Sequence, residues 1–362
     1  MAQEISVIMS VYNAEKYLLE SVTSVLSQED VDFQLIIVND GSSDNSINIL
    51  SLIEEQDERV VVINQDNMGL AASLNTAINI STGEYIARMD ADDIADSKRL
   101  SKQLNFLKKN RNTGIVGSYV HVFGDGKERV WKYPINNNEC DVALLFLNPL
   151  AHPAVMFRRS VVDDIGLYDL SFEYDQDYEL WARASSSHRI SNIPDILLKY
   201  RIHNNQMGSV FSKTARIESQ KRTQYLLLKG MGLNPSEDDM EVHLLLSNSY
   251  RLEFDMVINY DGLVKAAKWI TEIVEMNKTT KRYDDYILRN RLHLQYNSLC
   301  LFMADKGMNV FTYFKVTSNY LGINPFNLTL WLSCLLKLGR KEHILIYNQI
   351  NRIKKIIQIV VK

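Results

Sequence analysis

Three carboxylates stand close together in the sequence, at Asp90, Asp92 and Asp93. They follow the apolar run of residues 85–87, which has the composition of a buried strand. An Asp-x-Asp pair on an extended backbone directs both side chains to the same side, and carboxylate oxygens are ligands that Mg²⁺ and Mn²⁺ prefer. The segment predicts a divalent metal site able to hold a diphosphate, although Asp clusters are also common in ordinary turns.

The elements that must position these carboxylates alternate between strand-like and helix-like patterns in the first half of the chain. Apolar runs predict strands over residues 5–11, 33–38, 60–63 and 85–89. Helical spacing predicts a helix that follows Asn13, with its pattern running from Tyr17 to Leu26. Two more are predicted, one from a cap at Ser43 or Asp44 through residue 50 and one over residues 71–80 that Gly83 closes. This order predicts an α/β fold with a mostly parallel sheet flanked by helices.

Polar residues follow three of these strands, at Ser10, Asp40 and Asp90. In open α/β sheets, ligands bind outside the carboxyl ends of the strands. Each residue alone is equally typical of a solvated loop, and Asp40-Gly41 is a common turn pair. Together they predict a nucleotide site in which Asp40 accepts an N–H of the base and Asp90 and Asp92 engage the ribose and the metal.

Composition limits the class of protein. The chain has 362 residues, 46% of them hydrophobic, which is enough for one large domain and an appendage. A net charge of −4 gives no general reason to expect a nucleic-acid partner. Three distant cysteines and the absence of a signal-peptide pattern or an apolar run of about 20 residues predict a cytoplasmic protein.

Four segments in order, residues 5–13, 38–44, 67–69 and 90–93, resemble glycosyltransferase family 2, the inverting transferases with the GT-A fold. The resemblance extends over about residues 5–210. It implies a nucleotide-diphosphate sugar as donor, with UDP favoured, and Mn²⁺ or Mg²⁺ bound by Asp92 and His203. The donor-binding residues that it implies are Ser10, Tyr12, Asn13, Asp40, Asn67, Gly69, Asp90, Ala91 and Arg201.

The same resemblance implies an acceptor side. Residues 148–158 are similar to the segment beneath the donor sugar, and residues 175–181 occupy the place of the family's Glu-Asp-Tyr-Asp-Leu-Trp motif. Asp177 is then the general base that takes the acceptor's proton, giving a β-linkage from an α-linked donor. The other residues implied at the acceptor or the sugar are His152, Asp175, Gln176 and Trp181.

Several positions depart from the family pattern. Ser10 and Ser97 stand where proline is common, Asn39 replaces the first of two aspartates, and Gln176 replaces a glutamate. The change at Gln176 leaves open that Asp175 shares the acceptor-binding role. The Gln-x-x-Arg-Trp motif and membrane helices of processive relatives are absent, which predicts the transfer of single sugars.

The resemblance ends near residue 213, so we expect a catalytic domain over residues 1–213 and a helical region over 214–362. Residues 236–239 predict a helix cap before residues 240–246, and residues 286–303 have helical spacing. The basic, apolar tail of residues 326–362 suits an interfacial helix on the inner face of the cell membrane. A helix packed on the domain or in a homo-oligomer is the alternative.

We therefore expect a peripheral-membrane enzyme of capsule or O-antigen polysaccharide biosynthesis, acting on a glycan or a lipid-linked oligosaccharide. Two other classes remain open. An Asp-x-Asp phosphatase would form an aspartyl-phosphate, but Ile94 stands where a hydroxyl residue is needed. A non-catalytic nucleotide-sugar binder would have no need of Asp177.

Overall fold

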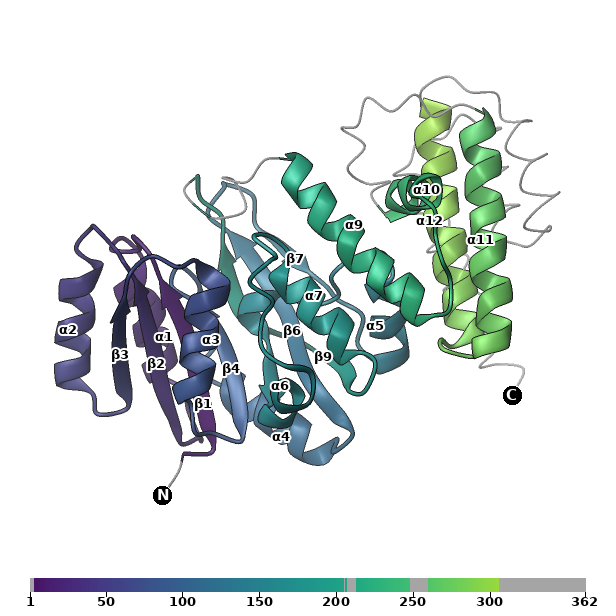
Figure 1. Ribbon diagram of the computed structural model, residues 1–362. Helices are drawn as coiled ribbons and strands as arrows, with labels where there is room; N and C mark the ends of the chain where they lie inside the picture. The colour runs from purple at the N-terminus through teal and green to yellow at the C-terminus, as the bar shows by residue number, and fades with distance from the viewer. Residues whose placement is uncertain (1–2, 205, 207–212, 248–259, 306–362) are drawn as a thin grey trace. The chain divides into compact units, whose positions relative to one another are not determined.

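The computed structural model describes residues 3–204, 206, 213–247 and 260–305. The chain divides into two compact units, Met1–Thr223 and Gln224–Lys362 (Figure 1). The expected domain boundary at residue 213 is where α9 (Lys213–Gly230) begins, and the division between the units falls inside this helix. The predicted tail helix of residues 326–362 lies outside the described residues.

A nine-stranded sheet forms the centre of the first unit. Its order is β3-β2-β1-β4-β8-β6-β9-β5, with β7 paired to β6. The strands are β1 (Ile5–Val11), β2 (Phe33–Asp40), β3 (Val60–Gln65), β4 (Tyr85–Asp90), β5 (Ile94–Ala95), β6 (Thr113–Phe123), β7 (Arg129–Trp131), β8 (Met156–Arg158) and β9 (Arg189–Arg201).

Helices flank this sheet and supply the cover that a mostly parallel sheet needs (Figure 1). They are α1 (Leu18–Leu26), α2 (Ser46–Gln56), α3 (Leu70–Ile80), α4 (Arg99–Lys109), α5 (Asn137–Leu144), α6 (Arg159–Ile165) and α7 (Gln176–Ala184), with the short η1 (His152–Ala154). The fold class predicted from the alternating patterns is confirmed.

The strands β3, β2, β1 and β4 run parallel, so their carboxyl ends lie at one edge. In this register Ser10 of β1 pairs with Asp90 of β4 on one side and with Val38 of β2 on the other. Apolar runs form these strands because both faces are covered, and β1 and β2 are almost fully buried. The register places the polar strand ends beside one another, as the sequence predicts.

β4 presents different chemistry on its two faces. Ala87 and Met89 belong to the core shared with α1 and α4. The intervening residues, Arg88 and Asp90, point to the other face because side chains alternate along a strand. A charged pair therefore sits inside the first unit, at the end of the central parallel strands.

Two local predictions about helix ends are wrong in detail. The cap residue of α2 is Asn45, not Ser43 or Asp44, although Asp44 Oδ1 accepts a hydrogen bond from the Ser46 N–H at 3.0 Å. α3 ends at Ile80, as predicted, but the residue that caps it is Ser81, not Gly83. A Cβ at Gly83 would lie 2.6 Å from the Ser6 nitrogen, so close backbone approach, not helix termination, requires this glycine.

The second unit is helical, with α10 (Glu237–Ser247), α11 (Tyr260–Thr280) and α12 (Asp285–Asp305) packed together (Figure 1). The predicted cap of α10 is confirmed: the Asp239 N–H donates to Ser236 Oγ, and the Ser236 N–H donates to Asp239 Oδ2 at 2.8 Å. Among the described residues, no helix combines the length and the apolar character that crossing a membrane requires.

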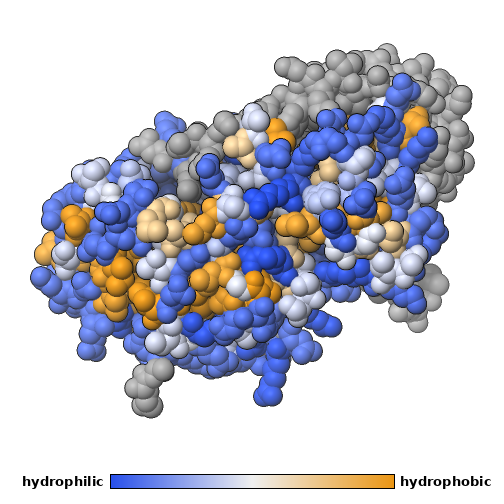
Figure 2. Space-filling view, viewed as in Figure 1, coloured by the Kyte–Doolittle hydropathy of each residue, from blue (hydrophilic) through white to orange (hydrophobic). Residues whose placement is uncertain are grey.

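Apolar patches interrupt the polar surface on the face shown in Figure 2. In the first unit the exposed large apolar side chains include Tyr12, Leu19, Met68 and Leu170. Scattered exposed apolar residues are normal for a folded protein. Tyr12 is itself a predicted donor-binding residue, and Met68 lies between two others, Asn67 and Gly69.

Candidate functional site

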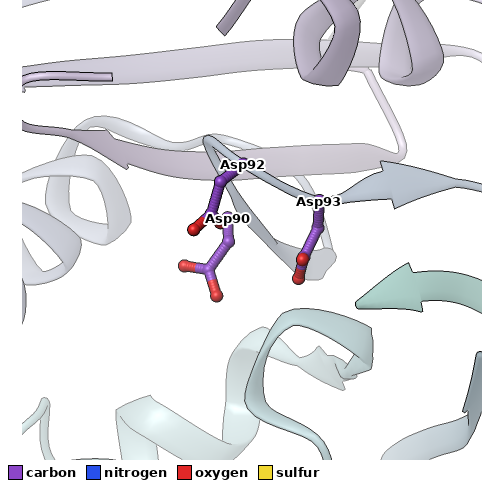
Figure 3. A group of neighbouring side chains, drawn as sticks. All are labelled: Asp90, Asp92 and Asp93. Carbon is purple, nitrogen blue, oxygen red and sulfur yellow. The ribbon is translucent and has the colours of Figure 1, made fainter. Parts of the chain in front are cut away.

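The acidic cluster predicted from the sequence is present in the fold. One oxygen from each of Asp90, Asp92 and Asp93 lies within 4.8 Å of the others. Figure 3 shows the three carboxylates projecting to the same side of the segment that carries them. Asp93 Oδ2 is buried and has no hydrogen-bond partner among the described residues. An oxygen-rich set with an unsatisfied carboxylate oxygen fits a hard divalent cation.

The three carboxylates lie close together for a different reason from the one that the sequence predicts. β4 ends at Asp90, and residues 91 and 92 form a turn, so the pair Asp90 and Asp92 does not lie on one extended strand. The turn, rather than strand alternation, brings the carboxylates together. Its backbone is fixed to α1, since Ser21 Oγ donates to the Asp90 carbonyl oxygen at 2.7 Å.

Burial and mutual repulsion perturb the cluster. Desolvation, opposed by the neighbouring Arg88 guanidinium, raises the pKa of Asp90. Desolvation and the charges of Asp90 and Asp92 raise the pKa of Asp93 well above its usual range. Uncompensated negative charge at close range favours either a proton or a cation. The cluster is therefore poised to take up a metal ion.

The predicted metal ligand His203 lies beside Asp92. Its Nε2 is 2.8 Å from Asp92 Oδ2, and both side chains are partly exposed. The His203 backbone N–H donates to Gln206 Oε1 at 2.8 Å, which holds the loop after β9 in place. The structure brings together the two side chains expected to bind the metal, one from the turn after β4 and one from the segment after β9.

Arg201 links these two segments. Its Nε donates to the Asp92 carbonyl oxygen at 2.8 Å, and its backbone N–H donates to Asp93 Oδ1 at 2.8 Å. Nη2 pairs with Glu20 at 2.5 Å, and the guanidinium lies between the rings of Tyr17 and Phe123 at 4.4 and 4.6 Å. Most of this side chain is thus engaged within the protein. The contact with a diphosphate expected for Arg201 stays a prediction.

Asp177, the expected base, lies in the first turn of α7. Asn148 Nδ2 donates to its Oδ2 at 2.6 Å, and burial is the largest influence that raises its pKa, against the opposing charge of Arg88. Its charge in turn contributes to the raised pKa of Asp90. The candidate base and the acidic cluster therefore lie close enough to interact electrostatically.

The other residues predicted on the acceptor side differ in accessibility. His152 Nε2 is 2.9 Å from the Tyr168 hydroxyl, and burial lowers the pKa of His152 well below its usual value, so the ring is neutral. Asp175 adopts a left-handed conformation with φ of 56° before α7. Gln176 is almost buried, and Trp181 is 0% exposed.

Trp181 is fully buried, and its expected contact with a sugar stays a prediction. Its ring packs edge-on against Phe157 and His152, with centroids 6.2 and 6.3 Å apart. It lies one helical turn after Asp177 on α7, and these contacts pack this part of the helix against η1 and β8.

Six of the predicted donor-binding residues lie at the ends of β1 and β2 or in the loops after β1 and β3. Asn13 Oδ1 accepts the Ser43 N–H at 2.8 Å, and Ser42 Oγ accepts the Asn13 N–H at 3.0 Å. A Cβ at Gly41 would lie 2.7 Å from the Asn67 nitrogen, so the second and third loops also touch. These contacts place the loops side by side at the carboxyl edge of the sheet.

Asp40 has an internal role that the sequence does not reveal. It is 2% exposed, and its Oδ1 accepts from Gln65 Nε2 and the Met68 N–H, both at 2.8 Å. Oδ2 accepts the Gly69 N–H at 2.9 Å. The carboxylate thus holds the turn before α3, and contact with a base stays a prediction.

Sequence reasoning missed Arg88, Asn148 and Glu20. Arg88 pairs with Asp90, Asn148 binds the candidate base, and Glu20 fixes Arg201. The sequence could have indicated Arg88. It is a charged residue inside an apolar run that is typical of a buried strand, and a buried charge needs a partner. Asn148 begins the segment of residues 148–158 noted in the sequence, but nothing there singled it out, and no pattern marked Glu20.

Comparison with known proteins identifies the family of this chain. The family model of glycosyl transferase family 2 matches residues 6–166. An uncharacterized glycosyltransferase of Haemophilus influenzae is 34% identical over 239 residues, which span 61% of this chain and 74% of that protein. The O-antigen biosynthesis glycosyltransferase WbnJ of Escherichia coli is 35% identical over 206 residues, spanning 55% of this chain and 80% of that protein.

The fold also has a counterpart among solved structures. S. aureus TarS 1–349 in complex with UDP-GlcNAc superposes with a TM-score of 0.57 at 15% identity, with 92% of both chains covered. At this identity the likeness concerns the fold, and it agrees with the expected GT-A architecture. From the family match, the relatives and the fold, the chain belongs to glycosyltransferase family 2 and is a nucleotide-sugar-dependent glycosyltransferase.

Proposed function

We propose that this enzyme is an inverting transferase that moves one sugar from a UDP-sugar to a hydroxyl group of a glycan or lipid-linked oligosaccharide. The observation that carries the proposal is the cluster of Asp90, Asp92 and Asp93 together with a separate, partly buried carboxylate, Asp177, whose charge acts on Asp90. Inversion needs one base on the acceptor side and charge stabilisation on the leaving side. The phosphatase and the non-catalytic binder are set aside by membership of the family.

The residues divide this chemistry between them. Asp92 and His203 would hold Mn²⁺ or Mg²⁺, which when bound offsets the charge that develops on the departing diphosphate. Asp177 accepts the proton of the attacking hydroxyl group, and Asn148 orients its carboxylate through the 2.6 Å hydrogen bond. With the base on the face opposite the leaving group, an α-linked donor gives a β-linkage.

The biological setting follows from the relatives. WbnJ takes part in O-antigen biosynthesis and the similar AmsE of Erwinia amylovora in amylovoran biosynthesis. We assign this enzyme to the assembly of a cell-surface polysaccharide on the same grounds. Contact of its C-terminal region with a membrane or a second copy of the chain belongs to the same proposal.

A panel of donors tests the function. Purified enzyme with Mn²⁺ is incubated with UDP-, GDP-, CDP- and dTDP-sugars, and release of the nucleoside diphosphate is measured with and without a mixture of glycan acceptors. TarS binds UDP-GlcNAc and has the same fold, so UDP-sugars come first. We expect acceptor-stimulated release of UDP and a β-anomeric product by NMR. An α-linked product or release of phosphate alone would refute the inverting mechanism.

The pH profile gives a second test. Asp177 must be ionised to act as a base, and burial raises its pKa. Protonation at low pH therefore removes the base, and we expect kcat/KM to fall with decreasing pH through a value above about 3.9, the ordinary pKa of aspartate. Initial rates between about pH 4.5 and 9 check this, with circular dichroism at each pH to monitor folding. The Asp177→Asn variant should lack this acidic limb.

A further inference from the structure

Arg88 is a buried cation in the middle of the sheet. Its side chain is 2% exposed and lies on the face of β4 opposite the core of Ala87 and Met89. Moving a charge out of water is costly unless the charge is paired and hydrogen-bonded. The position therefore raises the question of what this charge does for the protein.

The contacts of Arg88 satisfy only part of its guanidinium. Nη2 forms an ion pair with Asp90 Oδ1, while Nε and Nη1 have no hydrogen-bond partner within the described part of the chain. By contrast, the buried Arg99 donates to Gln103 and to the carbonyl oxygens of Arg88 and Val155. Because two of the three guanidinium nitrogens of Arg88 have no hydrogen-bond partner among the described residues, its position points to a role for its charge rather than for its hydrogen bonds.

The surroundings of Arg88 are acidic. Its charge lowers the pKa of Asp90, Asp93 and Asp177 against the raising effect of burial. Arg201, the other arginine at the cluster, directs its Nη2 to Glu20 instead. Arg88 is thus the arginine that forms an ion pair with a carboxylate of the cluster within the described residues.

We propose that Arg88 is a positioning residue that serves as the internal counter-ion of Asp90. It occupies one oxygen of Asp90 and cancels its charge, so that Asp92 and Asp93 supply the uncompensated charge for the metal. Binding of the metal without nucleotide is then weak, and the diphosphate of the donor completes the site. The inference rests on the metal site proposed above.

Mn²⁺ titration without nucleotide tests this directly, with free Mn²⁺ followed by electron paramagnetic resonance at a fixed pH near 8. Arg88→Gln removes the positive charge and frees an oxygen of Asp90, so we expect about tenfold tighter Mn²⁺ binding. Arg88→Lys keeps the charge, and its affinity should stay within about twofold of wild type. A purely structural arginine would instead give weaker binding in both variants.

Arg158→Gln is the matched control. Arg158 is also an arginine of the sheet, but its guanidinium donates to the carbonyl oxygens of Thr113 and Leu107, and it pairs in register with Tyr85 at the opposite end of β4. Its Mn²⁺ affinity should match wild type. Thermal unfolding of every variant separates a change of affinity from a loss of folding.

The double variant Arg88→Gln/Asp90→Asn keeps the test decisive if the single variant does not fold. It removes two opposite charges together, and we expect Mn²⁺ affinity within about threefold of wild type. A loss above about tenfold would show that Asp90 contributes its charge to the metal and would overturn the inference. Wild-type protein that binds no Mn²⁺ with or without UDP would remove the metal site itself, whereas wild-type binding unchanged in Arg88→Gln would remove only the role of Arg88.

Discussion

Replacing Asp177 with asparagine lowers kcat by about 10²–10⁴-fold, because a positioned general base contributes that much to rate. This corresponds to about 3–5 kcal/mol of barrier lowering. Asparagine has the same shape and its amide oxygen still accepts the hydrogen bond from Asn148, but it cannot take up the proton of the acceptor. kcat and kcat/KM should fall together, since the lost interaction operates only in the transition state.

Folding and donor binding should survive this change. Burial raises the pKa of Asp177, so the ionised carboxylate costs stability above the unfolded-state pKa, and asparagine removes that cost. We therefore expect an unchanged or slightly higher Tm near neutral pH and unchanged UDP affinity. Asp175→Asn is the matched control, expected to retain most of the activity. Equal losses in the two variants would mean that the base has been assigned to the wrong residue.

Replacing Asp92 with alanine abolishes metal-dependent nucleotide binding. Two unit charges 4 Å apart interact by about 4 kcal/mol at an effective dielectric constant near 20. Because each 1.4 kcal/mol is about tenfold in affinity, the loss should be about two to three orders of magnitude. The change also removes the partner that lies 2.8 Å from His203 Nε2, so both expected ligands are affected. Turnover should fall with binding.

Calorimetric titration of UDP, GDP, CDP and dTDP, each with Mn²⁺ and with EDTA, measures this effect and identifies the nucleotide. Asp195→Ala is a suitable control because this carboxylate, on β9, pairs with Lys102 at the surface and is 45% exposed. We expect the control to bind one nucleotide like wild type. Binding of the same nucleotide by Asp92→Ala with wild-type affinity in Mn²⁺, and its loss in EDTA, would show that Asp92 does not hold the metal.

The sequence alone determined the fold class and the place of the site. The apolar run of residues 5–11 predicted β1 with its observed bounds, Ile5–Val11. Similar runs predicted the parallel strands that end at Asp40 and Asp90. These predictions succeed because burial on both faces requires continuous apolar runs, and parallel strands bring their carboxyl ends to one edge. The acidic motif could be recognised in the sequence because it directly follows an apolar run that predicts a buried strand.

Side-chain roles that depend on distant partners were decided only by the tertiary structure. Asp40 is engaged by Gln65, Met68 and Gly69, and Trp181 is buried against Phe157 and His152, which the sequence does not show. The pairing of Arg88 with Asp90 places opposite charges at neighbouring positions on one face of β4. Sequence spacing fixes the face on which a side chain lies, whereas burial and the groups that meet it there depend on how the separate loops and helices pack.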